Sequence, residues 1–162
     1  MVDQQEQSGV AVRHSIVVEA PQDRAFTVFT QRMQSWWPME SHRIGGKPIT
    51  DLVTEPRAGG RWYERAEDGS ECDWGRVVAW EPPARVVLTW QVSHDWKPAP
   101  EIHTEIEVRF TPEGEDRTRV DLEHRGLEAF GEHTEQMRSI FGSDGGWGGL
   151  LKRFAGAAGG TG

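Results

Sequence analysis

Hydrophobic residues recur with a spacing of two through most of this chain and change to a helical spacing at only two places. Residues 13–19 alternate and predict a first strand. Pro21 then opens a helix that reaches about Ser35, with Phe26 and Phe29 on its apolar side. After a loop with two Trp, alternation returns and predicts six further strands at 49–54, 60–65, 72–80, 85–92, 102–110 and 118–124. This order of strand, helix and strand run constrains the fold more than any other feature.

The second helical spacing lies near the C-terminus and completes the fold class. Four large apolar residues recur on one side of an amphipathic helix: Trp147, Leu150, Leu151 and Phe154. Because that side must be buried against the sheet, the element order predicts an α+β, helix-grip fold, in which a curved antiparallel sheet of six to seven strands wraps around a long C-terminal helix. The 162 residues predict one domain at 12–155 between disordered tails at 1–11 and 156–162.

The composition excludes several classes of protein. The 26 acidic residues outnumber 18 basic ones, the formal net charge is −8, and no segment concentrates Lys or Arg, so nucleic acid is not an expected partner. Cys72 is the single cysteine, which excludes an intramolecular disulfide and a cysteine-based zinc site. The N-terminal stretch has no signal-peptide core, and no apolar run approaches about 18 residues. We therefore expect a cytoplasmic protein without a membrane segment.

The chain holds eight Trp and only one Tyr, and this preference needs a structural reason. Trp combines a large apolar surface with one N–H donor, which suits walls that are part core and part pocket. Alternation places these side chains on the inner face of the sheet: Trp62, Glu64, Trp74, Val78, Trp80, Val86, Leu88, Trp90, Val92, Val120, Leu122 and His124. Core packing explains any one Trp, whereas several on one concave face are hard to pack without a gap. The pattern therefore predicts a cavity.

A few polar residues are candidates for chemistry in that cavity. His124 and His14 fall on the inner face, where an imidazole could orient a ligand carbonyl or act as a general base, although such a residue is more often a hydrogen-bonded part of the core. His42, in the loop after Trp37, could reach over the cavity mouth or lie in solvent. Glu64 is the one inward carboxylate, which predicts either a buried ion pair, for example with Arg76, or a group that handles protons.

Other polar residues point to no known chemistry. Asp95, with His94 and His103, could hold a metal only if its loop folded back, and no metal-binding spacing is present. No nucleophile elbow, phosphate loop or dinucleotide fingerprint occurs, so we expect no cofactor, no metal and no catalytic motif. The remaining acids alternate outward and predict a solvated face of the sheet: Glu105, Glu107, Asp121 and Glu123.

Nearly the whole predicted domain, from Ile16 to Phe154, resembles a known family. The matching segments are VVEAPQDRAFTVFT at 17–30, WWPMESH at 36–42, EPRAGGRWYER at 55–65, DWGRVVAWEPPARVVLTW at 73–90, TEIEVRFTPEG at 104–114, TRVDLEHRGL at 118–127 and GGWGGLLKRF at 145–154. In this order they are similar to the branch of the SRPBCC (START/Bet v 1-like) superfamily that is like the activator of heat-shock protein 90 ATPase. The resemblance implies a helix-grip fold with an internal cavity, often used for apolar small molecules, and it implies no particular reaction.

Three functions are consistent with this reading. We favour a binding protein that holds a small, largely apolar or aromatic molecule, and the alternative is a cyclase or dehydratase acting in the same cavity. The third is a co-chaperone-like or regulatory partner of another protein, but the co-chaperone activity belongs to members with an additional N-terminal domain, which we do not find in these 162 residues. A homodimer remains open. The residues expected to line the cavity are Trp37, His42, Trp62, Glu64, Trp74, Leu88, Trp90, Leu122, His124, Trp147 and Leu151.

Overall fold

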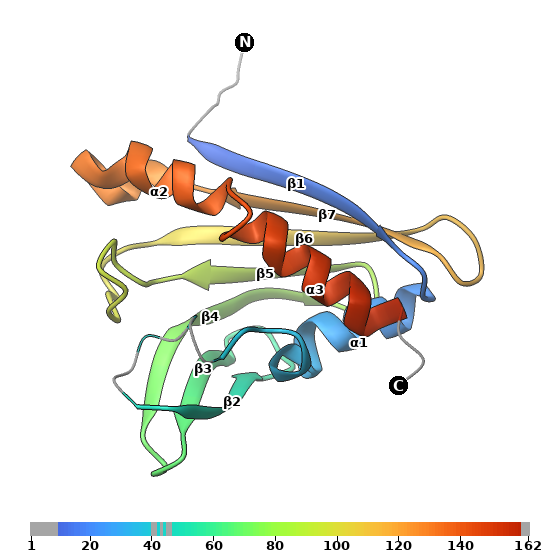
Figure 1. The fold of residues 1–162 in the computed structure, drawn as a ribbon, viewed down its shortest axis with the longest axis horizontal. Coiled ribbons are helices and arrows are strands. Elements are labelled where there is room, and N and C mark those ends of the chain that lie inside the picture. The colour runs from blue at the N-terminus through green and yellow to red at the C-terminus, as the bar shows by residue number, and fades with distance from the viewer. Residues whose placement is uncertain (1–9, 40–41, 43, 45–46, 160–162) are drawn as a thin grey trace.

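The residues that the structure describes form a seven-stranded antiparallel sheet with strand order β1-β7-β6-β5-β4-β3-β2 (Figure 1). This computed structural model describes residues 10–39, 42, 44 and 47–159. The strands are β1 (Ala11–Val18), β2 (Ile49–Thr54), β3 (Arg61–Ala66), β4 (Glu71–Glu81), β5 (Arg85–Trp90), β6 (Thr104–Pro112) and β7 (Thr118–Arg125). The helices are α1 (Gln22–Gln31), α2 (Thr134–Phe141) and α3 (Trp147–Gly159), with 3-10 turns η1 (Met33–Ser35) and η2 (Leu127–His133).

The first strand of the chain pairs with the last, and this pairing organises the sheet. Strand β1 runs antiparallel to β7 with Ile16 opposite Val120, so α1 must carry the chain to the far edge, where β2 begins. The sheet then returns strand by strand and curls around α3, which lies across its inner face together with α1 (Figure 1). Phe29 of α1 and Phe154 of α3 meet edge to face at 5.2 Å. The α+β helix-grip class expected from the sequence is confirmed.

Helix α3 carries its four large apolar side chains into the core, as the spacing predicts. The helix continues to Gly159, beyond the end of the domain expected at residue 155, and Ala158 is buried. The guanidinium Nε of Arg24 donates a hydrogen bond of 2.7 Å to the carbonyl of Ala158, which stabilises the negative end of the helix. The expected C-terminal tail is therefore too long by four residues. At the other end, Ala11, the last residue of the expected N-terminal tail, is already part of β1, and residues 1–9 and 160–162 lie outside the described residues.

Strand β4 departs from simple alternation, and the expectation for Val78 is wrong. Register shifts interrupt its pairing with β3 beside Trp74 and its pairing with β5 beside Val78. Each extra residue reverses which side of the strand faces inward. Consequently Val77 is buried between the two shifts, whereas Val78 is 47% exposed. Trp74 and Trp80 still face inward because the second shift cancels the first.

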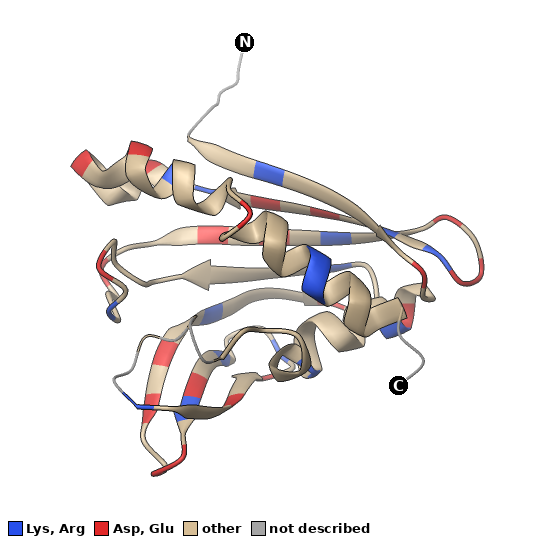
Figure 2. Ribbon diagram, viewed as in Figure 1, with Lys and Arg blue, Asp and Glu red and all other residues tan. Residues whose placement is uncertain are grey.

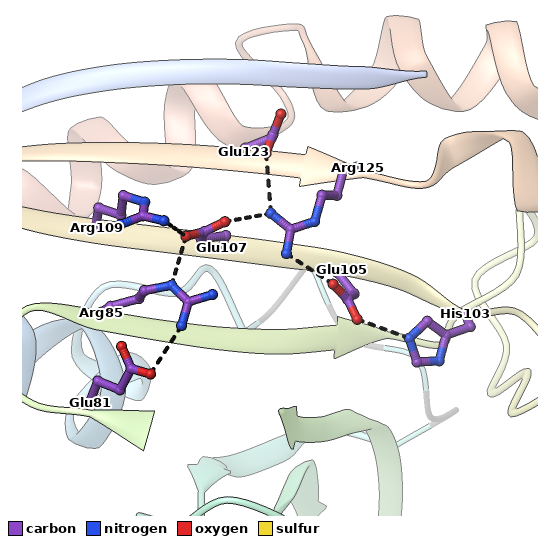
Figure 3. Close-up of polar contacts among 8 residues, drawn as sticks. All are labelled: Glu81, Arg85, His103, Glu105, Glu107, Arg109, Glu123 and Arg125. Carbon is purple, nitrogen blue, oxygen red and sulfur yellow. Dashed lines mark hydrogen bonds and ion pairs between the residues drawn. The ribbon is translucent and has the colours of Figure 1, made fainter. Parts of the chain in front are cut away.

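The outer face of the sheet carries a network of ion pairs (Figure 3). Glu107 of β6 lies at its centre and accepts contacts from Arg85 at 2.7 Å, Arg109 at 2.6 Å and Arg125. The outward orientation of Glu107 agrees with the alternation, but its residue is only 9% exposed, so this part of the face is less solvated than expected. Over the rest of the sheet, acidic and basic residues are interspersed along the strands rather than gathered by sign (Figure 2).

The arginines around Glu107 change its acidity. Burial alone would raise the pKa of this carboxyl group, but hydrogen bonds from Arg85 and Arg125 and the charge of Arg109 outweigh burial and lower the pKa below its usual value. The carboxylate is therefore ionised near neutral pH and holds three neighbouring strands together through their side chains.

Candidate functional site

A pocket of about 330 Å³ opens at the end of the sheet where α2 meets α3. Its walls come from the loop after η1, from β4 and β5, from the loop between β5 and β6, and from the two helices. The described residues that line it are Trp37, His42, Trp74, Trp90, Trp96, Ile140, Phe141, Gly145, Gly146, Trp147 and Leu150. Five of these described residues are Trp, so the walls are mainly aromatic.

The indole rings form a continuous belt around the pocket. Trp74 lies between two others, with ring centres 5.3 Å from Trp37 at an angle of 89° and 5.0 Å from Trp90 at 78°. Trp147 completes the belt at 6.2 Å from both Trp37 and Trp90. Edge-to-face packing of this kind stabilises aromatic pairs and fixes the angle of each ring. The belt therefore presents a rigid aromatic wall rather than an adaptable one.

Three of the indoles donate their N–H groups to acceptors in the protein. Trp37 Nε1 donates to the carbonyl of His42 at 2.7 Å. Trp74 Nε1 donates to the Oε1 atom of Glu64 at 3.0 Å, and Trp147 Nε1 donates to His124 Nδ1 at 3.1 Å. Because each N–H is already used, these rings offer a ligand chiefly apolar and π surface.

His124 is fully buried behind this wall and does not line the pocket. Its Nδ1 accepts the Trp147 N–H, so the neutral ring carries its proton on Nε2, which donates to the hydroxyl of Thr104 at 2.8 Å. That hydroxyl donates in turn to the carbonyl of Trp90 at 2.9 Å. Burial lowers the pKa of His124 to about 3, which keeps the imidazole neutral. The arrangement gives His124 a structural role in orienting Trp147 and leaves it without a lone pair for general base catalysis.

Glu64 is also buried, at 2% exposure, and it too lies outside the pocket lining. Its Oε1 accepts the backbone N–H of Ile44 at 2.8 Å as well as the Trp74 indole. The expected ion pair with Arg76 is wrong, because Arg76 is exposed on the opposite face of β4. Glu64 instead joins the loop around Ile44 to the aromatic belt.

His42 is the one imidazole among the described lining residues. Its Nε2 donates to the carbonyl of Gly145 at 3.0 Å, across to the segment before α3. Its backbone N–H donates to Pro38 at 2.8 Å, and its carbonyl accepts the Trp37 indole. These bonds hold His42 in the pocket lining, which is one of the two positions that the sequence left open. The neighbouring residues Glu40, Ser41 and Arg43 of the same loop lie outside the described residues.

The structure therefore divides the residues expected to line a cavity into two groups. Five line the pocket: Trp37, His42, Trp74, Trp90 and Trp147. The other six are buried beside or beneath it and do not line it: Trp62, Glu64, Leu88, Leu122, His124 and Leu151. Along most of its length the interface between sheet and α3 is thus filled by side chains, and the open space lies at one end.

Sequence reasoning missed Trp96, which forms an outer wall of the pocket. Trp96 is 39% exposed, has a left-handed backbone conformation with φ of 63°, and meets Trp90 edge to face at 6.4 Å. Its turn is closed by hydrogen bonds between Ser93 and Lys97 and is joined to the helical region by the stacked rings of His94 and His133, 3.5 Å apart. The polar sequence of this turn gave no sign of a pocket wall.

The remaining missed residues come from the link between the two C-terminal helices. Ile140 and Phe141 of α2 and Leu150 of α3 line the pocket, and helical spacing within one segment could not show that these two helices meet the belt. Gly146 is required by close approach, because a Cβ atom there would lie 2.2 Å from the carbonyl oxygen of Ile140. His14 is not among the residues that line the pocket; its ring lies under α3, with Cε1 3.7 Å from the position that a Cβ on Gly148 would occupy.

Reactive and metal-binding groups are sparse in the described parts of the chain. No three His, Cys, Asp or Glu side chains there come together as a metal site would require. Burial, together with the charges of Glu64 and Asp73, raises the pKa of the Cys72 thiol, which makes it a poor nucleophile. Within the same residues, no helix is long and apolar enough to cross a membrane.

Comparison with known proteins identifies relatives of this architecture. The anthrahydroquino-gamma-pyrone synthase Txn09, solved as a complex, is 39% identical, with 91% of this chain and 96% of that chain covered and a TM-score of 0.64. The self-sacrificing resistance protein CalC from Micromonospora echinospora is 30% identical over 91% of this chain and 93% of its own, with a TM-score of 0.65. The Aha1 dimer from Colwellia psychrerythraea shares the fold with a TM-score of 0.60. It is 16% identical, with 93% of this chain and 96% of that chain covered.

A search of curated proteins found no match. The model of the family described as Activator of Hsp90 ATPase homolog 1-like protein matches residues 19–159, which is most of the chain. This match agrees with the resemblance seen in the sequence motifs and with the helix-grip fold. The chain belongs to the Activator of Hsp90 ATPase homolog 1-like family.

Proposed function

We propose that this protein binds a small, flat, largely apolar aromatic molecule in the pocket at the end of the sheet. The observation that carries the proposal is the set of five indoles, the four of the belt and that of Trp96, around a space of about 330 Å³. Ligand pockets of roughly 300–1,000 Å³ with mainly apolar and aromatic walls are typical sites for small molecules. A molecule of about three fused rings is the size that such a space favours.

The relatives support the same kind of ligand. Txn09 is named as a synthase of an anthrahydroquino-gamma-pyrone, which is a fused aromatic ring system, and it is 39% identical to this chain. CalC is named as a resistance protein, so a related chain serves in a protective role rather than in synthesis. Synthesis and resistance are thus found on one fold, so the fold alone implies no particular reaction. Binding of a small molecule needs only the pocket, and we therefore favour binding over catalysis.

Catalysis is the second candidate, and the identity to Txn09 is the observation that favours it. His42 is the residue placed for such a role, because its ring lines the pocket whereas His124 and Glu64 do not. A substrate carbonyl that displaced the Gly145 carbonyl would accept the Nε2–H of His42, and this hydrogen bond would polarise the substrate. His124 and Glu64, the proton-handling candidates from the sequence, serve instead to support the belt.

A protein-binding role has less support. A docking surface for another protein needs a contiguous apolar patch. The exposed large hydrophobic residues in the described part of the chain are Val17, Val78 and Trp96, which come from β1, β4 and the β5–β6 loop. Of these, Trp96 already belongs to the pocket.

The test uses 1,8-dihydroxyanthraquinone as a probe and measures both the melting temperature and Trp fluorescence. We expect the probe to stabilise the parent, because a ligand at a hundredfold excess over its Kd adds about 2.7 kcal/mol to the folded state. Trp96→Ala should weaken binding, and Trp80→Ala, a change at a half-buried Trp outside the pocket lining, should not. Failure of the parent to bind, or equal weakening by both changes, contradicts the proposal. Native mass spectrometry of the purified protein supplies the natural ligand, and conversion of that ligand by the parent but not by His42→Gln would assign catalysis.

A further inference from the structure

One buried indole of the pocket wall has no hydrogen-bond partner. Trp90 lines the pocket and is 4% exposed, and its Nε1 donor is buried without an acceptor in the described part of the chain. By contrast, Trp37, Trp74 and Trp147 donate their N–H groups to protein acceptors. Trp96 is exposed and can donate to water. Because buried donors are paired in most proteins, an unpaired donor in a pocket wall needs an explanation.

The surroundings of this N–H are aromatic. Six rings of described residues have their centres 5.0 to 6.4 Å from that of Trp90: Trp62, Trp74, Trp96, His124, Phe141 and Trp147. Of these, only His124 could accept through a nitrogen lone pair, but its Nδ1 already accepts the Trp147 N–H and its Nε2 donates to Thr104. The faces of aromatic rings accept an N–H only weakly. These neighbours therefore offer the Trp90 donor no strong acceptor.

The wall beside Trp90 has one part that an entering molecule can displace. Five of the six neighbouring rings are at most 3% exposed, whereas Trp96 is 39% exposed. The Trp96 ring meets that of Trp90 edge to face at 6.4 Å, and it is carried by a turn rather than by a strand or helix. A molecule that moves Trp96 aside can thus approach the Trp90 indole without disturbing the buried rings of the belt.

A carbonyl oxygen on the ligand is the simplest group that fits this donor. It accepts a hydrogen bond and brings no donor that would need a partner of its own. A carbonyl on a fused ring system also has its lone pairs in the plane of the rings. The oxygen can therefore accept the N–H of one wall residue while the faces of the ligand contact the other indoles.

We propose that the Trp90 N–H is the donor that recognises the ligand, so that the pocket selects flat aromatic molecules with a ring carbonyl over hydrocarbons of the same shape. The carbonyl gives the buried donor a partner, whereas a hydrocarbon leaves it unpaired. The inference rests on the proposed function, because it names the chemical group that the aromatic ligand carries.

The experiment compares 9-fluorenone with fluorene, two flat tricyclic molecules of nearly the same outline, of which only the ketone has an acceptor. Equilibrium dialysis, with the protein in excess over a trace of probe, measures the Kd of each. The two probes also differ in their free energy of transfer from water. The measured quantity is therefore the Kd of fluorene divided by that of fluorenone, compared between the parent and its variants, because the transfer difference cancels in this comparison.

Two wall variants form a matched pair. Trp90→Phe keeps an aromatic ring and removes the N–H, so we expect the Kd ratio to fall about 3- to 10-fold. Trp147→Phe removes the same part of a wall indole, but that N–H is already donated to His124. This change should weaken both probes alike and leave the ratio within about 2-fold of the parent. Melting curves show that each variant is folded.

The indole N–H signals of the parent give an NMR test that needs no variant protein for binding. Trp62 is the internal control, because its buried N–H also lacks a partner but the residue does not line the pocket. The Trp90 indole proton should lie further downfield in the fluorenone complex than in the fluorene complex, since a hydrogen bond to oxygen deshields it. The Trp62 proton should have the same position in both complexes.

The outcomes separate the role of Trp90 from the function beneath it. An unchanged Kd ratio in Trp90→Phe, or an equal fall in Trp147→Phe, would overturn that role while leaving aromatic binding intact. A Trp90 proton with the same position in both complexes would overturn it too, and this result decides if Trp90→Phe does not fold or binds neither probe. If neither probe binds the parent, the proposed function fails and the selection fails with it.

Discussion

The hydrogen bonds around His124 run in one direction, from the Trp147 indole through the imidazole and the Thr104 hydroxyl to the carbonyl of Trp90. Each group in this series donates one hydrogen bond. The series therefore holds Trp147 and Trp90, which both line the pocket, in fixed positions. The sequence identified His124 as an inward residue, but it could not distinguish a base from a support. That distinction depends on partners from β6 and α3, which are far from His124 in the sequence.

The buried imidazole makes stability depend on pH. The pKa of His124 is lowered from 6.5 to about 3 in the folded protein, so between these values the unfolded chain binds a proton that the folded chain does not. Stability should therefore fall as the pH decreases from 6.5 towards 3, by up to about 1.4 kcal/mol per pH unit from this group. His124→Gln should lack this part of the slope. Urea unfolding of both proteins at pH 4.5 to 7.5 measures the free energy of unfolding as a function of pH. If this free energy changes with pH equally in both proteins, His124 does not stay neutral.

Glu107 provides a second test at the level of a residue. Its pKa is lowered in the folded state by Arg85 and Arg125, so its contribution is present above the unfolded value of about 4.3 and is lost as the pH falls through the folded pKa. Glu107→Gln should lower stability at pH 7 by about 1–3 kcal/mol, because three arginines lose a charged acceptor. Glu81→Gln, at an exposed partner of Arg85, should cost less than about 1 kcal/mol. Chemical denaturation measures the loss of unfolding free energy in each variant. Equal losses would contradict the central position of Glu107 in the network.

Among the elements, the strands were predicted well wherever pairing is regular. Strands β6 and β7 pair without interruption, and their alternating residues fall on the expected faces. Strand β4 was predicted with the right position and the wrong inner residue at Val78, because a bulge reverses the alternation and no local residue pattern announced it. Helix α3 was predicted from its spacing, but its last turn, rich in Gly and Ala, depends on Arg24 from another part of the chain.

The bulge in β4 also explains why a glycine occupies position 75. A Cβ atom on Gly75 would lie 2.0 Å from the carbonyl oxygen of Thr89, so the two strands approach too closely for any side chain. We expect Gly75→Ala to destabilise the protein by about 1–3 kcal/mol, since the backbone must move.

The matched change is Gly156→Ala on α3, where nothing lies within 4 Å of the added atom. This change should stabilise by up to about 1 kcal/mol, because alanine favours a helix more than glycine does. Thermal unfolding of both variants compares the two positions. A neutral result at Gly75 would mean that the strands are further apart than they are in this structure.

For the whole molecule, the sequence predicted that a Trp-rich cavity exists on the inner side of the sheet but not where it opens. Alternation assigns each side chain to a face, and it treats Trp62 and Trp90 alike. Both rings are buried, and only the assembled fold shows that Trp90 lines the pocket, beside the β5–β6 loop and the junction of α2 with α3, whereas Trp62 does not. The position of the pocket depends on contacts between distant segments, which no pattern within one segment reveals.

The central claim is that an aromatic molecule binds among these indoles, and NMR of the Trp side chains tests it most directly. The eight Trp residues give eight indole N–H signals, which substitution can assign. On addition of 1,8-dihydroxyanthraquinone we expect the signals of the pocket residues to shift together, with a common Kd: Trp37, Trp74, Trp90, Trp96 and Trp147. The signal of Trp80, which packs against Phe26 outside the pocket lining, should stay in place. The account is contradicted if the indole signals of the pocket residues do not change at saturating probe, or if the Trp80 signal shifts while they do not.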